Sequence, residues 1–188
     1  MSVRKPDTGE FFHMANSQAT VATYLTTEAR FADTAYRGEC ALSLPLPVSR
    51  HLVPGGGRLL DVLWAELRPL MSPRAVAVLK GINATGWTTR PVLASPEVSM
   101  VREYRALVVT GRGGEVTPCA RHPELAPEAE NSIIRGWCFD PNEWDGSDLW
   151  LQRSGAMLLI VSARVAAAFR KAKVSGVRLI DVRDEFGW

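Results

Sequence analysis

Two segments of about twenty residues, ninety positions apart, resemble each other in this chain, with five identities. In each copy a serine, Ser72 or Ser162, stands where it can cap the N-terminus of a helix, and Pro73 suits a first helical turn. Order and spacing predict the same succession in both copies: strand, capped helix, glycine turn, strand. The alternative is that any two strand–helix–strand segments look this similar. The superposed pairs are Ser72 with Ser162, Arg74 with Arg164, Ala77 with Ala167, Gly86 with Gly176 and Val92 with Val182, and Lys80 falls on Arg170.

Few other regular elements are evident from the residue pattern. Residues 111–114 (GRGG) predict a flexible turn and residues 54–58 (PGGGR) a loop, because glycine and proline interrupt regular structure. The first 50 residues predict only one or two short strands. The predicted helices cover residues 73–81 and 163–173, and the predicted strands cover residues 88–93, 104–110 and 157–161.

Together these elements predict an α+β (mixed α/β) fold class. The length of 188 residues suits one domain, and 46% apolar with 22% charged residues is typical of a folded chain. We expect a single compact domain in which two strand–helix–strand units share one core. Within it, residues 1–55 form a less regular, variable N-terminal part and residues 56–188 form the core.

The net charge of +2 hides two opposed segments. Residues 115–150 carry eight acidic and two basic side chains, a balance of −6, whereas residues 151–183 carry seven basic and one acidic, a balance of +6. The acidic segment is also rich in tryptophan, a residue type enriched at interface hot spots. It therefore predicts a docking surface for a basic partner. The candidate contact residues are Trp137, Asp140, Glu143, Trp144, Asp145 and Asp148.

Other interpretations of both charged segments stay open. The acidic segment can be a solvated loop whose tryptophans fill the core. Asp145 and Gly146 can form a tight turn, because Asp-Gly between apolar runs is a strong turn signal, and Asp148 can pair inside the domain. The cations of residues 151–183 can line the solvent face of a helix, or they can form a nucleic-acid-binding module, which the near-neutral total charge disfavours.

No catalytic or phosphate-binding motif occurs in the sequence. Cys119 and His122 form a C-x-x-H pair, and with Cys138 they allow a three-ligand zinc site, whereas structural zinc requires four ligands. We expect instead two ordinary buried thiols beside a surface histidine. The expectation is a protein without catalysis, cofactor or metal, and an enzyme with an unrecognised Cys/His site is the alternative.

Neither a leader nor a membrane span is expected. Residues 1–15 contain Pro6 and two acidic residues, and no long apolar run follows them. The longest apolar stretch, residues 156–162, is far below the ~20 residues that a bilayer-spanning helix needs. Three scattered cysteines favour a reducing compartment over a secreted disulfide framework. We therefore expect a cytoplasmic protein.

Residues 136–150 (GWCFDPNEWDGSDLW) are followed by an apolar strand, by VSARVAAAFRKAKVSGVRL at residues 161–179 and by IDV. This arrangement resembles a large bacterial family of immunity proteins from polymorphic toxin systems, frequent in myxobacteria. The WDGSD phrase is its specific part, and the likeness extends over residues 58–182. The resemblance implies an antitoxin of interbacterial competition that binds and neutralises a cognate toxin or effector stoichiometrically, without catalysis or cofactor.

The resemblance also implies which kind of partner to expect, a toxin with a basic active-site cleft. Many antibacterial toxins are nucleases with a basic active-site cleft, which an acidic surface can occupy in place of the phosphate backbone. No membrane partner is expected. A sister branch of the family carries paired C-x-x-C-G metal motifs, which this chain lacks, so no metal is carried over. In such antitoxins variable regions often determine specificity, and here that region is residues 1–50.

Overall fold

The computed structural model describes residues 11–17, 25–26, 45–50, 59–65, 68–122, 133–152, 158–184 and 186–187. The loop predicted at residues 54–58 lies outside this part of the chain.

Strands dominate the described residues, which contain fourteen strands, two nine-residue α-helices and one 3-10 helix. The predicted α+β class is therefore wrong, and the fold is β-dominated. Most strands are short and pair with distant segments, so their propensity shows weakly in the sequence, whereas a capped helix is a local pattern. The elements are β1 (Phe11–Asn16), β2 (Leu25–Thr26), β3 (Leu46–Arg50), β4 (Val62–Ala65), β5 (Arg68–Met71), α2 (Pro73–Gly81), β6 (Trp87–Ala94), η3 (Pro96–Val101), β7 (Arg105–Val109), β8 (Gly111–Arg112), β9 (Val116–His122), β10 (Ile133–Phe139), β11 (Leu149–Leu151), β12 (Leu159–Ser162), α3 (Ala163–Lys171), β13 (Val177–Asp181) and β14 (Phe186–Gly187).

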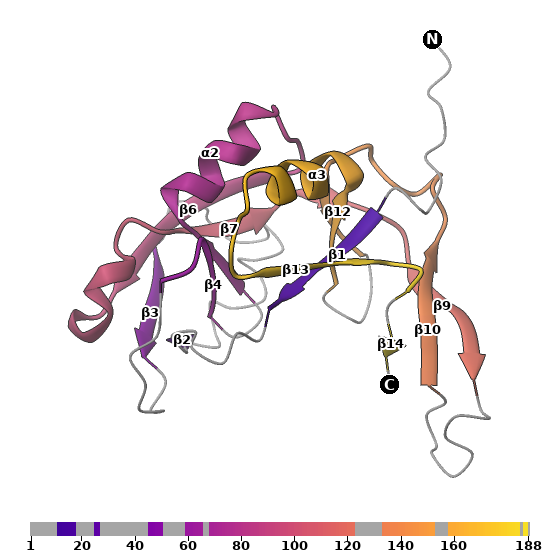
Figure 1. Ribbon diagram of the computed structural model, residues 1–188, viewed down its shortest axis with the longest axis horizontal. Helices are drawn as coiled ribbons and strands as arrows, with labels where there is room; N and C mark the ends of the chain where they lie inside the picture. Colours follow the sequence, from indigo (N-terminus) through magenta and orange to yellow (C-terminus); the bar gives the residue numbers. More distant parts are fainter. Residues whose placement is uncertain are drawn as a thin grey trace.

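The described strands form three sheets. A five-stranded sheet has the order β13-β1-β12-β11-β8, a closed barrel runs β2-β3-β6-β7-β5-β4, and a three-stranded sheet has the order β14-β10-β9. The helices α2 and α3 lie next to each other on one side of the strands, and the ribbon of β9 and β10 lies at the end of the molecule away from β3 (Figure 1). The main core lies under both helices and includes Leu79 of α2 and Phe169 of α3.

The two predicted helices are confirmed. α2 covers residues 73–81 as predicted, and α3 ends at Lys171, two residues earlier than predicted. Both serine caps form: the Ala75 N–H donates to Ser72 Oγ at 3.2 Å, and the Val165 N–H donates to Ser162 Oγ at 3.4 Å. A serine cap typically contributes about 1 kcal/mol to helix stability.

The strands around the helices were predicted less completely. The strands predicted at residues 88–93 and 104–110 correspond to β6 and β7. The flexible turn predicted at residues 111–114 is wrong, because Gly111 and Arg112 form β8 and pair in parallel with β11. The strands β9 and β10 of the acidic segment were not predicted at all.

The ninety-residue repeat is present in three dimensions. The strands β4, β5, β6 and β7 with α2 form a first unit, in the order β6-β7-β5-β4. The strands β11, β12, β13 and β1 with α3 form a second unit, in the matching order β13-β1-β12-β11. All neighbours within both units are antiparallel, and the registers match: Met71 pairs with Arg105 in the first unit, and Val161 pairs with Phe12 in the second.

The second unit is completed from the other end of the chain. In the first unit, β7 follows β6 along the chain and pairs with it. In the second unit that place belongs to β1, which pairs with both β12 and β13. Residues 11–16 of the N-terminal part therefore lie inside this unit, while the domain boundary at residue 55 stays a prediction.

Two aspartates connect the units. Asp61 precedes β4 and accepts hydrogen bonds from the N–H and the hydroxyl of Ser175 in the second unit, at 2.9 and 2.8 Å. It also pairs with Arg74 of its own unit at 2.6 Å. Asp148 precedes β11 and makes the equivalent contacts from the second unit. It accepts hydrogen bonds from the N–H and the hydroxyl of Thr85 in the first unit and pairs with Arg164 of its own unit.

The two arginines, Arg74 and Arg164, also form hydrogen bonds between the units. Arg164 donates to the carbonyl oxygen of Ile82 at the end of α2, at 2.6 Å, and Arg74 donates to that of Ala172 at the end of α3. Each helix C-terminus, where backbone carbonyls lack intrahelical partners, is thus covered by a cation from the other unit.

Candidate functional site

The acidic segment rests on a cluster of four aromatic rings. Phe11 of β1 is at its centre, with ring centroids 5.1 Å from Phe139, 5.0 Å from Trp144 and 6.0 Å from Trp150, all edge to face. Phe139 and Trp150 are also 5.0 Å apart. Edge-to-face pairs of this kind add about 0.5–1.5 kcal/mol each beyond their buried area. The cluster joins β1, β10 and β11. Through Trp144 it also holds the loop of residues 140–148 against the core.

Short hydrogen bonds fix the loop itself. The side chain of Asp140 accepts from the Asn142 N–H at 2.8 Å, and the indole N–H of Trp144 donates to the Ser147 carbonyl at 2.9 Å. Asp145 accepts from the Ser147 N–H at 2.9 Å and from the Arg112 N–H at 2.7 Å. The tight turn predicted at Asp145 is therefore supported, and β8 anchors it.

Three of the predicted contact residues face solvent together. Asp140, Glu143 and Asp145 are exposed, and no ion pair involves their carboxylates within the described part of the chain. Trp144 is half-buried over the aromatic cluster. These four residues form what we call the acidic loop surface.

Asp148 lies elsewhere. Its side chain is buried, with 7% of the residue exposed, and it belongs to the network between the two units. Burial alone would raise its pKa, but hydrogen bonds from Arg164, Ser162 and the Thr85 backbone outweigh burial and lower the pKa. The structure thus supports internal pairing for Asp148 and separates it from the acidic loop surface.

Trp137 also lies outside that surface. It is half-buried on β10 and packs against the aromatic cluster. Its indole N–H is buried and has no hydrogen-bond partner among the described residues. The tryptophans of the acidic segment therefore pack mainly on the core side, which agrees with the alternative interpretation of them as core-filling residues.

The two cysteines of the segment are not free thiols. Cys119 on β9 and Cys138 on β10 form a disulfide, with Cα atoms 5.1 Å apart, so the expectation of two ordinary buried thiols is wrong. Cys119 is moreover exposed. Their sulfurs are bonded to each other and are unavailable as zinc ligands or as a nucleophile. Disulfides persist mainly in oxidising compartments, so this bond weighs against a cytoplasmic location, which stays a prediction.

The basic segment is divided among separate roles. Arg164 pairs with Asp148, Arg183 pairs with Asp181 at 2.7 Å, and Arg170 lies 4.5 Å over the ring of Phe12. Lys171 at the end of α3 is exposed, as predicted for the solvent face of a helix, and so is Lys173, which lies just past that end. Arg178 is exposed on β13.

Comparison with protein-family models and with curated proteins finds no match to this chain. Within the residues that the structure describes, no three His, Cys, Asp or Glu side chains come together as a metal site. None of the described helices has the length and apolar composition needed to cross a bilayer.

Proposed function

We propose that this chain is a binding protein that neutralises a cognate toxin stoichiometrically, by placing the acidic loop surface against a basic cleft of the toxin. The observation that carries the proposal is the arrangement of Asp140, Glu143 and Asp145: three solvent-facing carboxylates within six residues, without ion pairs among the described residues. The likeness of the WDGSD segment to immunity proteins of polymorphic toxin systems supports the same function.

The rigidity of the loop favours binding. Its backbone is fixed by Asp145 and Arg112 on one side and by the Trp144 ring on Phe11 on the other. A loop that is already ordered loses little conformational entropy when a partner docks, so more of the interaction energy appears as affinity.

The negative charge of the acidic loop surface favours a partner with a positively charged cleft. Closely spaced carboxylates on an ordered loop attract a cationic cleft over a Debye length of about 8–10 Å and accelerate association. A nuclease cleft, which binds a polyanion, has this property.

The test requires a candidate toxin, which is sought as a neighbouring gene that encodes a large secreted protein with a small variable C-terminal domain; that domain serves as the toxin. It is expressed in a bacterial host with and without the present chain. We expect the chain to restore growth and to bind the purified toxin domain in calorimetry, more weakly at higher salt. Glu143→Lys should lower the affinity by about tenfold or more.

Glu103→Lys is the matched control, because Glu103 is an exposed carboxylate outside the acidic loop surface. It should bind like the unmodified chain. The proposal is wrong if the chain does not protect the host, or if Glu143→Lys and Glu103→Lys bind equally at both salt concentrations.

A further inference from the structure

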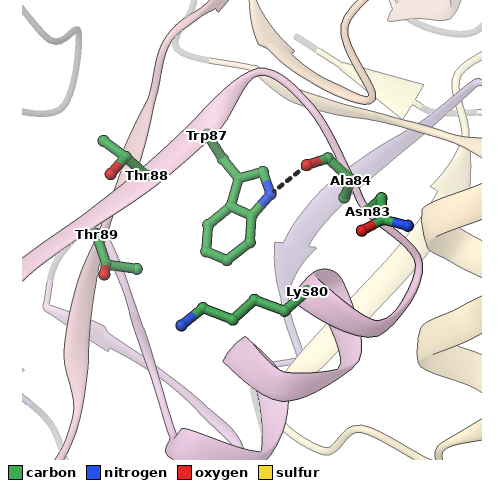
Figure 2. Close-up of a pocket in the computed structure, with 6 residues that line it drawn as sticks. All are labelled: Lys80, Asn83, Ala84, Trp87, Thr88 and Thr89. Atoms are coloured by element: carbon green, nitrogen blue, oxygen red, sulfur yellow. Dashed lines mark hydrogen bonds between the residues drawn. The ribbon is translucent and has the colours of Figure 1, made fainter.

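An open pocket of about 580 Å³ lies between the end of α2 and the start of β6. Figure 2 shows the Trp87 ring at its centre, with Lys80 extending beneath the ring toward Thr89. This volume is within the range of about 300–1,000 Å³ typical of small-molecule sites. The lining residues are Lys80, Asn83, Ala84, Trp87, Thr88 and Thr89.

The indole of Trp87 is held in one orientation. Its N–H donates to the carbonyl oxygen of Ala84 at 2.9 Å. The ring packs partly against the main core and remains half-buried. Because the N–H is already used, the indole offers a ligand its π face and no donor. A flat ring is the group that such a face binds best.

The polar groups around the indole are unused. The ammonium of Lys80 and the hydroxyls of Thr88 and Thr89 form no hydrogen bond or ion pair within the described chain. Side chains alternate along a strand, so Thr89 lies on the same face of β6 as Trp87 and Thr88 on the other. An ammonium and a hydroxyl are typical phosphate ligands, the first through charge and the second through a hydrogen bond.

The second unit shows that the fold does not require this pocket. Arg170, the equivalent of Lys80, lies 4.5 Å over the ring of Phe12. In the first unit, Arg105 occupies the register position that Phe12 has in the second. Arg105 has no aromatic ring and is itself a cation, so Lys80 cannot form the equivalent cation–π contact. The polar Thr89 likewise stands where the second unit has Leu179. The first unit therefore departs from its own copy at the residues that line the pocket.

The helix end nearby does not repel an anion. The carbonyl groups at a helix C-terminus carry partial negative charge. Here the carbonyl oxygens of Ile82 and Asn83 accept hydrogen bonds from Arg164, at 2.6 and 3.4 Å. A guanidinium thus covers the negative end of α2 beside the pocket, and because it is itself paired with Asp148, the charge nearest an anionic ligand is that of Lys80.

We propose that this pocket binds a nucleoside monophosphate, with the base stacked on Trp87 and the phosphate held by the Lys80 ammonium and the Thr89 hydroxyl. The same chemistry can come from a free nucleotide or from a nucleotide at the end of a single strand. The proposal is independent of toxin binding, because the pocket lies on α2 and β6, outside the acidic loop surface.

Calorimetric titration of the full chain with adenosine and uridine monophosphates tests the proposal. We expect saturable one-to-one binding. Adenosine without phosphate and inorganic phosphate alone should each bind at least about tenfold more weakly, since each lacks one of the two paired interactions. Benzoate should also bind at least about tenfold more weakly, because its carboxylate is attached directly to the ring and lacks the spacing between base and phosphate. A short single-stranded oligonucleotide separates the two sources: a free-nucleotide site binds it no better than the monophosphate, and a strand-end site binds it more tightly.

Variants locate the binding. Lys80→Gln should weaken binding about tenfold, whereas Lys171→Gln, the matched exposed lysine at the end of α3, should not change it. Thr89→Val keeps the side-chain shape and should also weaken binding, with melting temperature as the check on folding. The proposal is overturned if no monophosphate binds, if benzoate binds as tightly as the monophosphates, or if Lys80→Gln and Lys171→Gln behave alike.

Discussion

Asp148 accepts two hydrogen bonds from Thr85, a residue 63 positions earlier in the chain: one from the N–H at 2.9 Å and one from the hydroxyl at 3.2 Å. The Asp148 N–H returns a third bond to the Thr85 hydroxyl at 3.1 Å. Asp61 and Ser175 repeat the same three bonds between the units in the opposite direction. These two aspartates therefore connect the repeated units as a reciprocal pair, and their contribution is structural.

Replacing either aspartate should destabilise the whole molecule. Asp148→Ala leaves the Thr85 and Ser162 donors, whose bonds to it are partly buried, without their acceptor, and a donor left unpaired away from water costs about 1–3 kcal/mol. We expect a loss of about 2–4 kcal/mol in the free energy of unfolding, measured by urea denaturation, and a similar loss for Asp61→Ala. Asp184→Ala, an exposed aspartate, should stay within about 0.5 kcal/mol of the unmodified chain. Equal stabilities for all three variants would contradict this role.

Stability should fall in acid for the same reason. Burial by itself raises the pKa of Asp61, but bonds from the Ser175 backbone and from Arg74 lower it below the ordinary value of 3.8, as for Asp148. At low pH the unfolded chain then binds more protons than the folded one, so the stabilisation is complete above the ordinary pKa and is lost as pH falls through the folded value.

Urea denaturation from about pH 6 to about pH 2 measures this effect. The double variant Asp61→Asn/Asp148→Asn should show a clearly flatter dependence below about pH 4 than the unmodified chain. Parallel curves for the two proteins would show that other carboxylates cause the acid sensitivity.

Two equivalent glycines should be intolerant of alanine. Gly86 and Gly176 have φ of +78° and +89°, and an added Cβ would lie 2.2 Å from the Leu149 carbonyl oxygen or 1.9 Å from that of Val62. Backbone strain of about 1–2 kcal/mol adds to this clash, so the melting temperature should drop by at least about 4 °C for each variant. Gly81→Ala is the control, because a Cβ there meets nothing within 4 Å. It should be neutral or slightly stabilising.

The disulfide should stabilise the ribbon of β9 and β10. It closes a loop with a sequence separation of 19, for which the loss of chain entropy predicts about 3 kcal/mol. Cys119→Ser/Cys138→Ser should lower the free energy of unfolding by about that amount. Alkylation of the purified chain followed by mass spectrometry should find both residues protected until a reductant is added, and labelling of both without reductant would contradict the bond.

The sequence predicted what is local. Ser72 and Ser162 marked both helix starts because a cap, a first turn and an apolar stripe lie within a few residues. The identities at ninety residues indicated the repeat because Arg74 and Arg164 have equivalent partners. The helix starts depend on residues close in sequence, and the repeat was recognised from residue identity alone.

What escaped prediction depends on distant partners. β8 looks like a glycine turn because its pairing with β11 joins residues 39 positions apart, Gly111 and Trp150. The fold class was wrong for the same reason, since short strands without clear alternation are stabilised by their neighbours across the sheet. The six residues of the pocket are ordinary in sequence, and only the fold brings Lys80 beneath Trp87.

The origin of β1 sets an order of assembly during synthesis. The first unit has all its strands once the ribosome has passed Val109, whereas β1, translated before the other described strands, must wait until β12 and β13 emerge. Asn16 and Leu159 are separated by 143 positions, so closing the second unit orders a long stretch of chain at once. Before β1 pairs with them, β12 and β13 have unpaired edges. Chains in which this pairing fails would therefore be prone to aggregate through these edges.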